Sequence, residues 1–327
     1  MTVLRMSLNE IYAPIQKELE EFSDCLKKEL ASDDALIADI HNHLLKMTGK
    51  FLRPALAIIC SRLEDKRDVR AIRLATAIEL IHTATLVHDD IIDDSQMRRN
   101  QPSICSKWGR EISIVSGDYL YAKAFLLLAS LKDMWINEAF AACAHVMCEG
   151  EMKQIERRNN FLMSEKEYLK IIHQKTAALF QAACAGGGYL SGTSHKNIEN
   201  LGAYGYALGM AFQIVDDCLD LTGETESLGK TAGLDVYKND VTLPLLYLFT
   251  DLKTNQRQTL LEEMKEGRSV TFESIKQLAL EKGAIEKAIG KAKNYVQESI
   301  EALNDFPQSP YKESLTRVSH YCLERIR

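Results

Sequence analysis

The dominant feature of this sequence is a helical spacing of apolar residues that continues through almost the whole chain. Between residues 68 and 94, for example, Ile72, Ala75, Ile78 and Ile81 recur at intervals of three or four residues, which is the period of one helix face. Only 6 of the 327 residues are proline, and long stretches contain neither proline nor glycine. The pattern predicts an all-α fold of roughly ten or more helices.

Turn-forming residues, rather than a linker, separate the expected helices. Breaks are expected at Gly49, around Asn100–Pro102, at Gly186–Gly188 and through Thr222–Gly233. We find no strand or hairpin pattern and no Pro/Gly/Ser-rich linker, so a single all-helical domain over residues 1–327 is expected. The expected helical stretches are 7–30, 34–47, 68–94, 113–132, 136–157, 165–190, 197–221, 240–252, 255–265, 272–281, 283–304 and 310–326.

Composition limits the class of protein. Apolar residues make up 46% and charged residues 26%, the balance of a soluble globular protein, and the net charge of −6 argues against a general nucleic-acid binder. The 8 cysteines form no CxxC pair and are expected to be buried thiols. No signal peptide is evident, and no run approaches the roughly 18 apolar residues of a membrane span. We expect a cytoplasmic protein with no transmembrane segment, and leave peripheral membrane contact open.

Two aspartate clusters end apolar helical runs. The first is Asp89-Asp90-Ile91-Ile92-Asp93 and the second is Asp216-Asp217-Cys218-Leu219-Asp220. In each cluster the first and last aspartates are four residues apart, so they share one helix face. The apolar neighbours are unlike those of a solvated acidic helix face, although two surface acidic patches remain the alternative.

Buried carboxylates need a cation, because an uncompensated buried charge costs several kcal/mol. Magnesium is the natural candidate, since it prefers a few carboxylate oxygens and completes its shell with water or phosphate oxygens. Calcium bound as in an EF-hand is not expected, because the loop spacing and glycine of that motif are missing.

A second group of motifs is basic. Lys50 and Arg53 precede Pro54 and an apolar helix expected to begin there, which places both cations just before a helix N-terminus that favours an anion. Arg98 and Arg99 follow the first aspartate cluster, and adjacent arginines can bind two phosphate groups. Three further candidates, each also readable as an ordinary core or surface residue, are His82, Lys175-Thr176 and Lys230.

Taken together, these residues resemble the trans-isoprenyl diphosphate synthases, also called polyprenyl synthetases. The resemblance runs in the family order from Gly49 to Pro244, and the ordered set is far more specific than any single motif. The matching motifs are Gly49-Lys50-x-x-Arg53-Pro54, His82, Leu86-Val87-His88-Asp89-Asp90-x-x-Asp93, Arg98-Arg99, Ser116-Gly117-Asp118, Lys175-Thr176, Gly209-x-x-Phe212-Gln213-x-x-Asp216-Asp217-x-x-Asp220, Gly229-Lys230-x-x-Gly233-x-Asp235 and Thr242-Leu243-Pro244.

The resemblance implies a prenyltransferase with antiparallel helices around a deep cavity, acting as a homodimer. It implies that the two clusters face each other across the cavity mouth and bind magnesium ions, three in this family, that hold an allylic diphosphate. The implied metal ligands are Asp89, Asp90, Asp93, Asp216, Asp217 and Asp220. By the same match, isopentenyl diphosphate is bound by Lys50, Arg53, His82 and Arg99, and the allylic diphosphate by Arg98, Lys175 and Lys230.

The implied reaction begins with ionisation of the allylic diphosphate, whose departing charge the cations stabilise. Thr176 and Gln213 are expected to present oxygen atoms to the allylic cation, so Lys175, Thr176 and Gln213 are the candidate catalytic residues. The double bond of isopentenyl diphosphate then attacks, and the released diphosphate is the favoured acceptor of the lost proton.

Two positions depart from the family pattern. Asn100 stands where the family usually has glycine, and asparagine tolerates a positive φ better than most residues. Asn239-Asp240 replaces the usual Gly-Lys, so an acid stands where a phosphate-binding lysine is expected; Lys238 is a possible substitute. Reduced activity, a different loop or a regulatory subunit are the alternatives that Asp240 leaves open.

In this family, bulky residues four or five positions before the first aspartate block the growing tail. Those positions hold Ala84 and Thr85, which are small, so we expect a medium- or long-chain all-trans product. Ile81 or apolar groups around Phe125–Leu128 are candidates for the floor. The alternatives are a farnesyl or geranylgeranyl diphosphate synthase and a non-catalytic subunit of a two-component synthase.

Overall fold

The computed structural model describes residues 7–47, 49–64, 66–223, 233–266 and 272–325. Nearly all regular structure in these ranges is helical, as predicted. The chain groups into two compact units, each with its own core. The first unit comprises Met1–Ala144, Leu179–Gly205 and Ile300–Val318, and the second comprises His145–Ala178, Tyr206–Ser299 and Ser319–Arg327. The single domain expected from the sequence stays a prediction.

The first unit opens with short, well-capped helices. In α1 (Leu8–Tyr12) the Ser7 hydroxyl accepts the N–H of Glu10 and the Glu10 carboxylate accepts the N–H of Ser7, a reciprocal cap. The 3-10 turn η1 (Ala13–Ile15) contains Pro14 and separates α1 from α2 (Gln16–Leu30), because proline lacks the N–H that a continuous helix needs. Helix α3 (Ala35–Lys46) follows.

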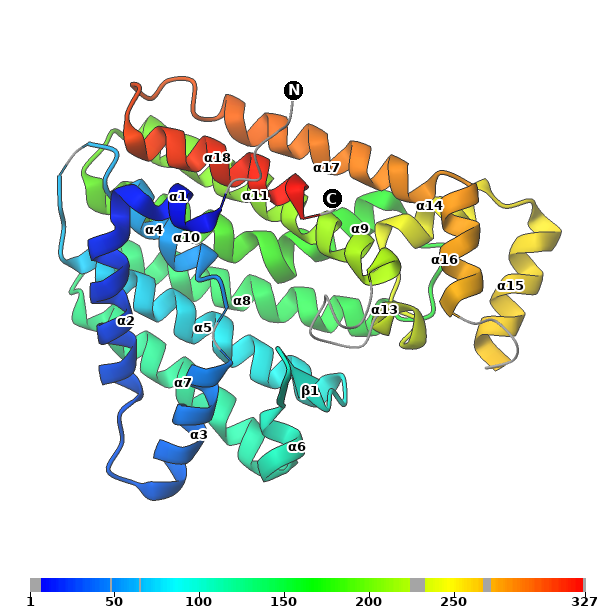
Figure 1. Cartoon of the computed structure of the whole chain (residues 1–327), viewed down its shortest axis with the longest axis horizontal. Coiled ribbons are helices and arrows are strands. Elements are labelled where there is room, and N and C mark those ends of the chain that lie inside the picture. Colours follow the sequence, from blue (N-terminus) through cyan, green and yellow to red (C-terminus); the bar gives the residue numbers. More distant parts are fainter. Residues whose placement is uncertain (1–6, 48, 65, 224–232, 267–271, 326–327) are drawn as a thin grey trace. The chain divides into compact units, whose positions relative to one another are not determined.

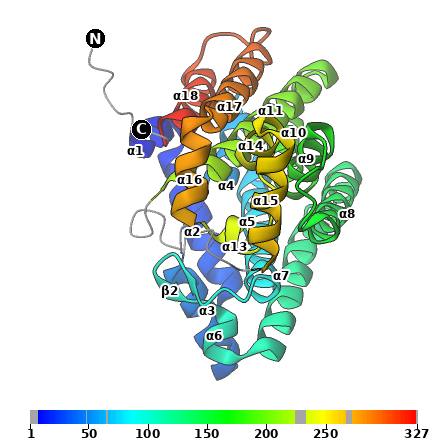
Figure 2. The same ribbon diagram turned by 90° about the vertical axis from the view of Figure 1, so that its right-hand side faces the viewer.

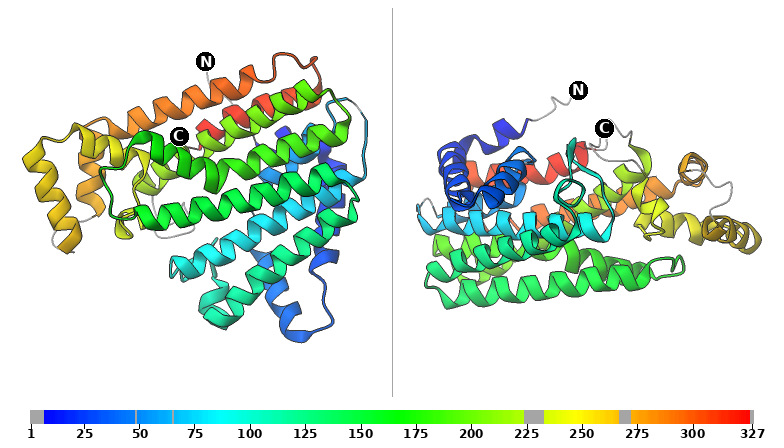
Figure 3. Two further views of the ribbon diagram at one scale, coloured as in Figure 1. Left: turned by 180° about the vertical axis from the view of Figure 1, so that it is seen from behind. Right: turned by 90° about the horizontal axis from the view of Figure 1, so that it is seen from below.

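Three helices form the centre of this unit: α4 (Leu52–Ser61), α5 (Arg70–Ile92) and α7 (Arg110–Ser130). Helices α5 and α7 lie side by side (Figures 1 and 3) and run antiparallel, since His88 contacts Ile114 near one end and Arg73 contacts Ser130 near the other. The side chains buried here are apolar and include Leu56, Ile58, Ile59, Leu74, Ile78, Leu120 and Leu128.

The predicted break at Gly186–Gly188 is wrong. These glycines lie inside α10 (Ala178–Ser191), which continues to Ser191. A Cβ atom on Gly187 would lie 2.2 Å from the carbonyl oxygen of Ala57, so α10 approaches the α4 backbone as only glycine permits. Close packing therefore outweighs the low helix propensity of glycine. The unit also contains α6 (Ile104–Trp108) and parts of α8 (Met134–Arg157), α11 (His195–Thr222) and α18 (Pro310–Glu324).

The expectation of no strands is also wrong at one place. Strands β1 (Met97–Arg98) and β2 (Gln101–Pro102) form a hairpin. Each strand has only 2 residues, too few to show an alternation of apolar and polar side chains. Figure 2 shows β2 beside α3 and α6, and His43 of α3 contacts the Pro102 carbonyl oxygen at 2.8 Å. The hairpin is thereby held against the rest of the unit.

The second unit contains α9 (Glu165–Ile172), a single π-helical turn η2 (His173–Ala177), α13 (Leu234–Tyr237) and α14 (Leu243–Asp251). It continues with α15 (Thr254–Glu266), α16 (Phe272–Glu281) and most of α17 (Ala284–Glu301). Ser164 and Glu167 form a second reciprocal cap at the start of α9. The core of this unit includes Ile214, Val215, Leu248, Phe249, Ile275, Ala279 and Ala288.

Candidate active site

The first aspartate cluster lies at the C-terminal end of α5. Asp90 is almost fully buried, and its Oδ1 accepts hydrogen bonds from Nε and Nη2 of Arg98 at 2.8 and 2.6 Å. Asp89 and Asp93 are partly exposed, and the backbone N–H of Asp93 donates to the carbonyl of Asp89 at 2.8 Å. The structure thus separates the cluster into a buried aspartate with an arginine counter-ion and two more accessible carboxylates on one helix face.

The β1–β2 hairpin positions the two arginines. Arg99 and Asn100 form its turn with φ angles of 50° and 61°, the left-handed conformation that two-residue hairpins require. Asn100 thus adopts the positive φ that asparagine was expected to tolerate. Arg98 lies in the strand and reaches Asp90, whereas the turn directs Arg99 to the carbonyl oxygen of Met47, 2.6 Å from Nη1. Gly49 makes room for it, since a Cβ there would lie 2.4 Å from Nη2.

Arg53 and His82, which the family motif assigns to one diphosphate, lie close together. Arg53 was expected just before a helix, but it lies inside one. Helix α4 begins at Leu52, after Phe51 in a left-handed conformation with φ of 50°, so Arg53 lies in its first turn. Nη1 of Arg53 donates to Nε2 of His82 at 3.1 Å, and the guanidinium lies 4.4 Å from the centre of the Phe180 ring. Burial, with Arg53, Arg99 and Arg98 nearby, holds the pKa of His82 well below its usual value, so His82 is a neutral acceptor.

Lys50 is exposed, and its backbone carbonyl accepts a hydrogen bond from the Tyr12 hydroxyl at 3.1 Å. Lys50 is therefore a surface residue, next in the chain to Gly49, where the Arg99 guanidinium packs.

Glu79 is a charged residue of this region that the sequence analysis missed. It is 6% exposed on α5, and burial raises its pKa from 4.5 to about 7, against the opposing effect of Arg53 and Arg99. A lone acid within the apolar run Ile78-Glu79-Leu80-Ile81 is the signal that could have identified it.

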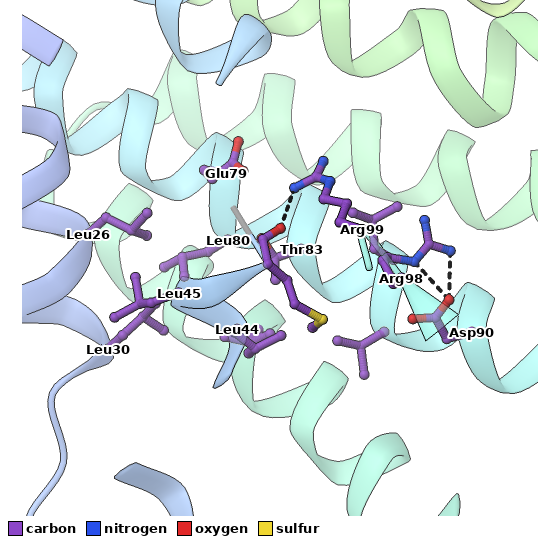
Figure 4. Close-up of a pocket in the computed structure, with 14 residues that line it drawn as sticks. Leu26, Leu30, Leu44, Leu45, Glu79, Leu80, Thr83, Asp90, Arg98 and Arg99 are labelled. Atoms are coloured by element: carbon purple, nitrogen blue, oxygen red, sulfur yellow. Dashed lines mark hydrogen bonds and ion pairs between the residues drawn. The ribbon is translucent and has the colours of Figure 1, made fainter. Parts of the chain in front are cut away.

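Glu79 lines a small cavity within the first unit (Figure 4). Leucines of α2 and α3 lie at one side of it, and Arg98, Arg99 and Asp90 lie at the other. Its volume is about 30 Å³, enough for a water molecule but far below the several hundred Å³ of typical ligand pockets. The cavity therefore does not accommodate a prenyl tail.

The predicted chain-length residues face elsewhere. Ala84 is fully buried, and the Thr85 hydroxyl donates to the His82 carbonyl at 2.7 Å; neither lines the cavity. His88 lies against Gly117, where a Cβ would be 2.1 Å from Nε2, and its ring stacks near Tyr121. The Ser116-Gly117-Asp118 motif thus gives α7 a close approach to α5.

In the second unit, each aspartate of the second cluster has a different partner. Oδ1 of Asp216 lies 2.5 Å from Nη2 of Arg325, which follows α18. The buried Asp217 accepts hydrogen bonds from the Tyr168 hydroxyl at 2.5 Å and from Nε2 of Gln213 at 2.8 Å. Burial raises the pKa of Asp217 above its usual range, and both hydrogen bonds oppose that shift.

Asp220 is tied to the segment that begins at Gly233. Its Oδ2 accepts the N–H of Asp235 at 3.1 Å, and its carbonyl accepts the N–H of Gly233 at 3.0 Å. Tyr168 and Arg325 were not identified from the sequence, because each lies far along the chain from the aspartate that it contacts.

Lys175 and Thr176 lie in the π-helical turn η2, a geometry often found at functional sites. The Thr176 hydroxyl donates to Oε1 of Gln213 at 2.7 Å, and Nζ of Lys175 lies 2.5 Å from Oε2 of Glu151 on α8. Gly150 lets α8 approach, since a Cβ there would lie 2.7 Å from the backbone nitrogen of Lys175. Thr176, Gln213 and Asp217 therefore form one continuous hydrogen-bonded chain.

The two remaining loop lysines are placed differently. Lys230 lies outside the described residues, and Lys238 is partly exposed beside the buried Asp240. The acid that departs from the family pattern is therefore directed into the protein. Its carboxylate contacts Nε of Arg158 at 2.9 Å and Nε2 of Gln154 at 3.1 Å.

The donor chemistry fits magnesium that arrives with a diphosphate. Across the residues that the structure describes, no three His, Cys, Asp or Glu side chains are grouped so that they would hold a metal ion by themselves. Mg²⁺ commonly takes only one or two carboxylates and completes its shell with water and substrate phosphates. Asp89 and Asp93 in the first unit and Asp216 in the second are partly exposed carboxylates of this kind.

Comparisons with known proteins agree with this reading of the fold. A sequence model of the family described as polyprenyl synthetase matches residues 34–281. An octaprenyl diphosphate synthase of Haemophilus influenzae is 31% identical over 321 residues, which cover 98% of each chain. Component 2 of the heptaprenyl diphosphate synthase of Geobacillus stearothermophilus is 31% identical over 326 residues, covering 98% of this chain and 99% of that one.

A solved structure of a polyprenyl synthase from Caulobacter crescentus, complexed with calcium and isoprenyl diphosphate, is 33% identical with a TM-score of 0.93 and covers 99% of both chains. The fold is thus the all-α isoprenoid synthase fold. The chain belongs to the polyprenyl synthetase family, and it is a prenyltransferase.

Proposed function

We propose that this protein is a magnesium-dependent trans-prenyltransferase that condenses isopentenyl diphosphate with an allylic diphosphate to a medium- or long-chain all-trans polyprenyl diphosphate. The observation that carries the proposal is the arrangement along α5. The accessible carboxylates Asp89 and Asp93 end this helix, and two turns earlier His82 accepts a hydrogen bond from Arg53. Helix α5 thus carries the carboxylates that we assign to the metal and the histidine that contacts Arg53 of α4, which we assign to a diphosphate.

Isopentenyl diphosphate is bound in this proposal by three cationic residues and one neutral histidine: Lys50, Arg53, Arg99 and His82. The packing of the two arginines supports this role. The Arg53 guanidinium lies over the Phe180 ring, and the Arg99 guanidinium packs on Gly49. A neutral His82 accepts from Arg53 and leaves the arginine charge undiminished, and arginine forks match the oxygens of a diphosphate.

The allylic diphosphate is assigned to the six aspartates of the two clusters, through Mg²⁺, together with Arg98, Lys175 and Lys230. When bound, the metal neutralises charge on the departing diphosphate. Arg98 and Lys175 supply further positive charge to the leaving group. Their partners Asp90 and Glu151 orient both side chains.

Thr176 and Gln213 orient oxygen atoms toward the allylic cation. Because the Thr176 hydroxyl donates to Gln213 and the Gln213 amide nitrogen donates to Asp217, the lone pairs of the Thr176 oxygen are left for the cation. Tyr168 completes this chain by donating to Asp217. The proton lost at the end of the reaction is assigned to the released diphosphate.

A medium or long product is supported by the register of α5 and α7. Since His88 lies beside Gly117 and Arg73 beside Ser130, Thr85 and Ile81 are level with Tyr121 and Phe125, at 1.5 Å rise per residue. Tyr121 stacks on Phe125. We therefore place the floor of the tail site at these rings, below the small residues Ala84 and Thr85.

A homodimer is supported by the exposed face of α7. Among the described helices, only α7 is long and apolar enough to cross a membrane, a criterion that the core helices of soluble proteins also meet. Only a third of its most apolar stretch is buried. Val115 and Leu126 are 65% and 71% exposed. Apolar patches of this kind mark interfaces, and we assign this one to a second copy of the chain. We place the dimer in the cytoplasm.

One experiment tests the proposal directly. The purified protein is incubated with Mg²⁺, labelled isopentenyl diphosphate and allylic primers of different length, and the products are sized by chromatography. A ladder ending beyond geranylgeranyl diphosphate is expected. A ladder ending at farnesyl or geranylgeranyl diphosphate establishes the short-chain alternative, and no product with any primer contradicts the proposal for the chain alone.

A two-component synthase is the second candidate, favoured by Asp240 in place of a phosphate-binding lysine and by the heptaprenyl component 2 relative. The same assay separates the two, because this candidate predicts product only after a second chain is added. The inward direction of Asp240 favours an active chain, since its charge is paired with Arg158.

A further inference from the structure

The segment from Gly233 to Asp240 connects two places in the second unit. At one end, the N–H of Asp235 donates to Oδ2 of Asp220, the last aspartate of the second cluster. At the other end, Asp240 is 4% exposed and its two carboxylate oxygens contact Arg158 and Gln154. Burial of a carboxylate is costly unless it is paired, so this end of the segment is held firmly.

Backbone contacts make the segment rigid between these ends. The N–H of Tyr237 donates to the carbonyl of Gly233 at 3.0 Å, and the N–H of Asp240 donates to the carbonyl of Asp235 at 2.9 Å. Asn239 adopts φ of 56°, and its carbonyl accepts the N–H of Asn159 at 3.0 Å. A displacement of Asp240 is therefore transmitted to the N–H that Asp220 accepts.

The anchor lies at the C-terminal end of α8, which also contacts the π-helical turn. Glu151 and Gln154 lie in the last turns of α8, three residues apart and so on one side of the helix, and Arg158 is the first residue after the helix. Glu151 contacts Lys175, whereas Gln154 and Arg158 contact Asp240. The C-terminal end of α8 and the residue after it thus hold both Lys175 and the segment that supports Asp220.

We propose that the Arg158–Asp240 ion pair is a positioning device for Asp220, and through it for the metal-bound allylic diphosphate. This inference rests on the proposed function. In this role, the contacts of Asp240 with Arg158 and Gln154 fix the position of Asp220 in the second cluster. Arg158 and Asp240 are positioning residues, because they act through Asp220 and touch no substrate.

The test is Asp240→Asn, which keeps the shape of the side chain and removes its charge. Loss of a group that orients a metal ligand typically weakens metal binding about 10- to 100-fold. We expect the half-saturating Mg²⁺ concentration and the KM for the allylic primer to rise about 10-fold. The KM for isopentenyl diphosphate stays within about two-fold, because the residues proposed to bind it lie in the other unit.

A binding measurement accompanies the kinetics. Mn²⁺ is titrated into the protein with inorganic diphosphate and followed by electron paramagnetic resonance, and its Kd is expected to rise about 10-fold in Asp240→Asn. The matched control is Glu156→Gln, which breaks the exposed Lys153–Glu156 ion pair on the same helix and leaves every constant unchanged.

Arg158→Lys keeps the charge and is expected to lie between wild type and Asp240→Asn; it replaces Asp240→Asn if that variant does not fold. A folded variant with wild-type Mg²⁺ and Mn²⁺ constants overturns the inference. Wild-type protein that binds Mn²⁺ with diphosphate but forms no product overturns the proposed function instead, and the Mn²⁺ titration still decides the role of the ion pair.

Discussion

Arg325 and Asp216 form an ion pair in the second unit, with 2.5 Å between Nη2 and Oδ1. The guanidinium also lies 4.4 Å from the centre of the Phe212 ring, one turn before Asp216 on α11. The first carboxylate of the second cluster is thus engaged by a residue from the end of α18.

Arg325→Gln removes this counter-ion. Because a cation on Asp216 must compete with the arginine, we expect divalent cations to bind more tightly by roughly 1 kcal/mol, or about five-fold. Titration of Mn²⁺ into the protein with inorganic diphosphate measures the change. Arg317→Gln, which breaks an exposed pair with Glu313 on the same helix, is the control. Weaker Mn²⁺ binding in Arg325→Gln would instead show that the arginine supports the site.

Glu79 predicts a pH dependence of stability. Its pKa is raised from 4.5 to about 7 in the folded protein, so the unfolded chain loses this proton first as the pH rises. The free energy of unfolding therefore falls by up to about 3 kcal/mol as the pH rises from 4.5 to 7, and it stays constant above pH 7. Glu79→Gln should remove most of this decline.

Guanidinium unfolding curves of wild type and Glu79→Gln, measured from pH 5 to 8, test this prediction. The variant is expected to be more stable at pH 8, with little difference at pH 5. Glu20→Gln, at an exposed position on α2, should follow wild type. Parallel curves for wild type and Glu79→Gln would contradict the raised pKa.

Phe125→Ala tests the floor of the tail site. Removing this ring, which stacks on Tyr121, should lengthen the main product by at least one five-carbon unit. Product sizing after incubation with labelled isopentenyl diphosphate measures the length. Leu36→Ala, an exposed truncation on α3, should leave it unchanged, and the same length from Phe125→Ala would move the floor elsewhere.

Leu126→Glu tests the dimer interface. A charge on the exposed face of α7 should abolish association, because a like charge then meets its own copy across a two-fold axis. Light scattering after size-exclusion chromatography should show the mass halved. Leu162→Glu places the same charge at a site that is 68% exposed and should stay dimeric. A wild-type protein that is already monomeric would refute the assignment.

The helices could be predicted because their apolar period is local. The errors arose where packing or turn geometry decides. Gly187 lies in a helix because α4 needs its missing side chain, and Arg53 enters α4 because Phe51 adopts a left-handed conformation before it. The β1–β2 hairpin has strands too short for a pattern, although the φ of Asn100 was predictable from its residue type.

The candidate site was predictable in its motifs and not in its partners. The family motif assigned Arg53 and His82 to one diphosphate, and their side chains lie within hydrogen-bond distance of each other. Tyr168, Arg325 and Arg158 are brought to the second cluster and its supporting segment by tertiary packing alone, and no spacing in the sequence links them to their aspartates. The roles of the predicted site residues stay predictions for the experiments above.

Two glycines of the first unit influence where the Arg53 guanidinium lies. Gly187 keeps α10 in backbone contact with α4, and Gly205 lies where a Cβ would be 2.4 Å from the Phe180 carbonyl oxygen. Since Phe180 supports the Arg53 guanidinium, a single added methyl group at either glycine would shift that support. Alanine at these positions would look conservative in a sequence comparison, yet it would displace the arginine that we propose binds isopentenyl diphosphate.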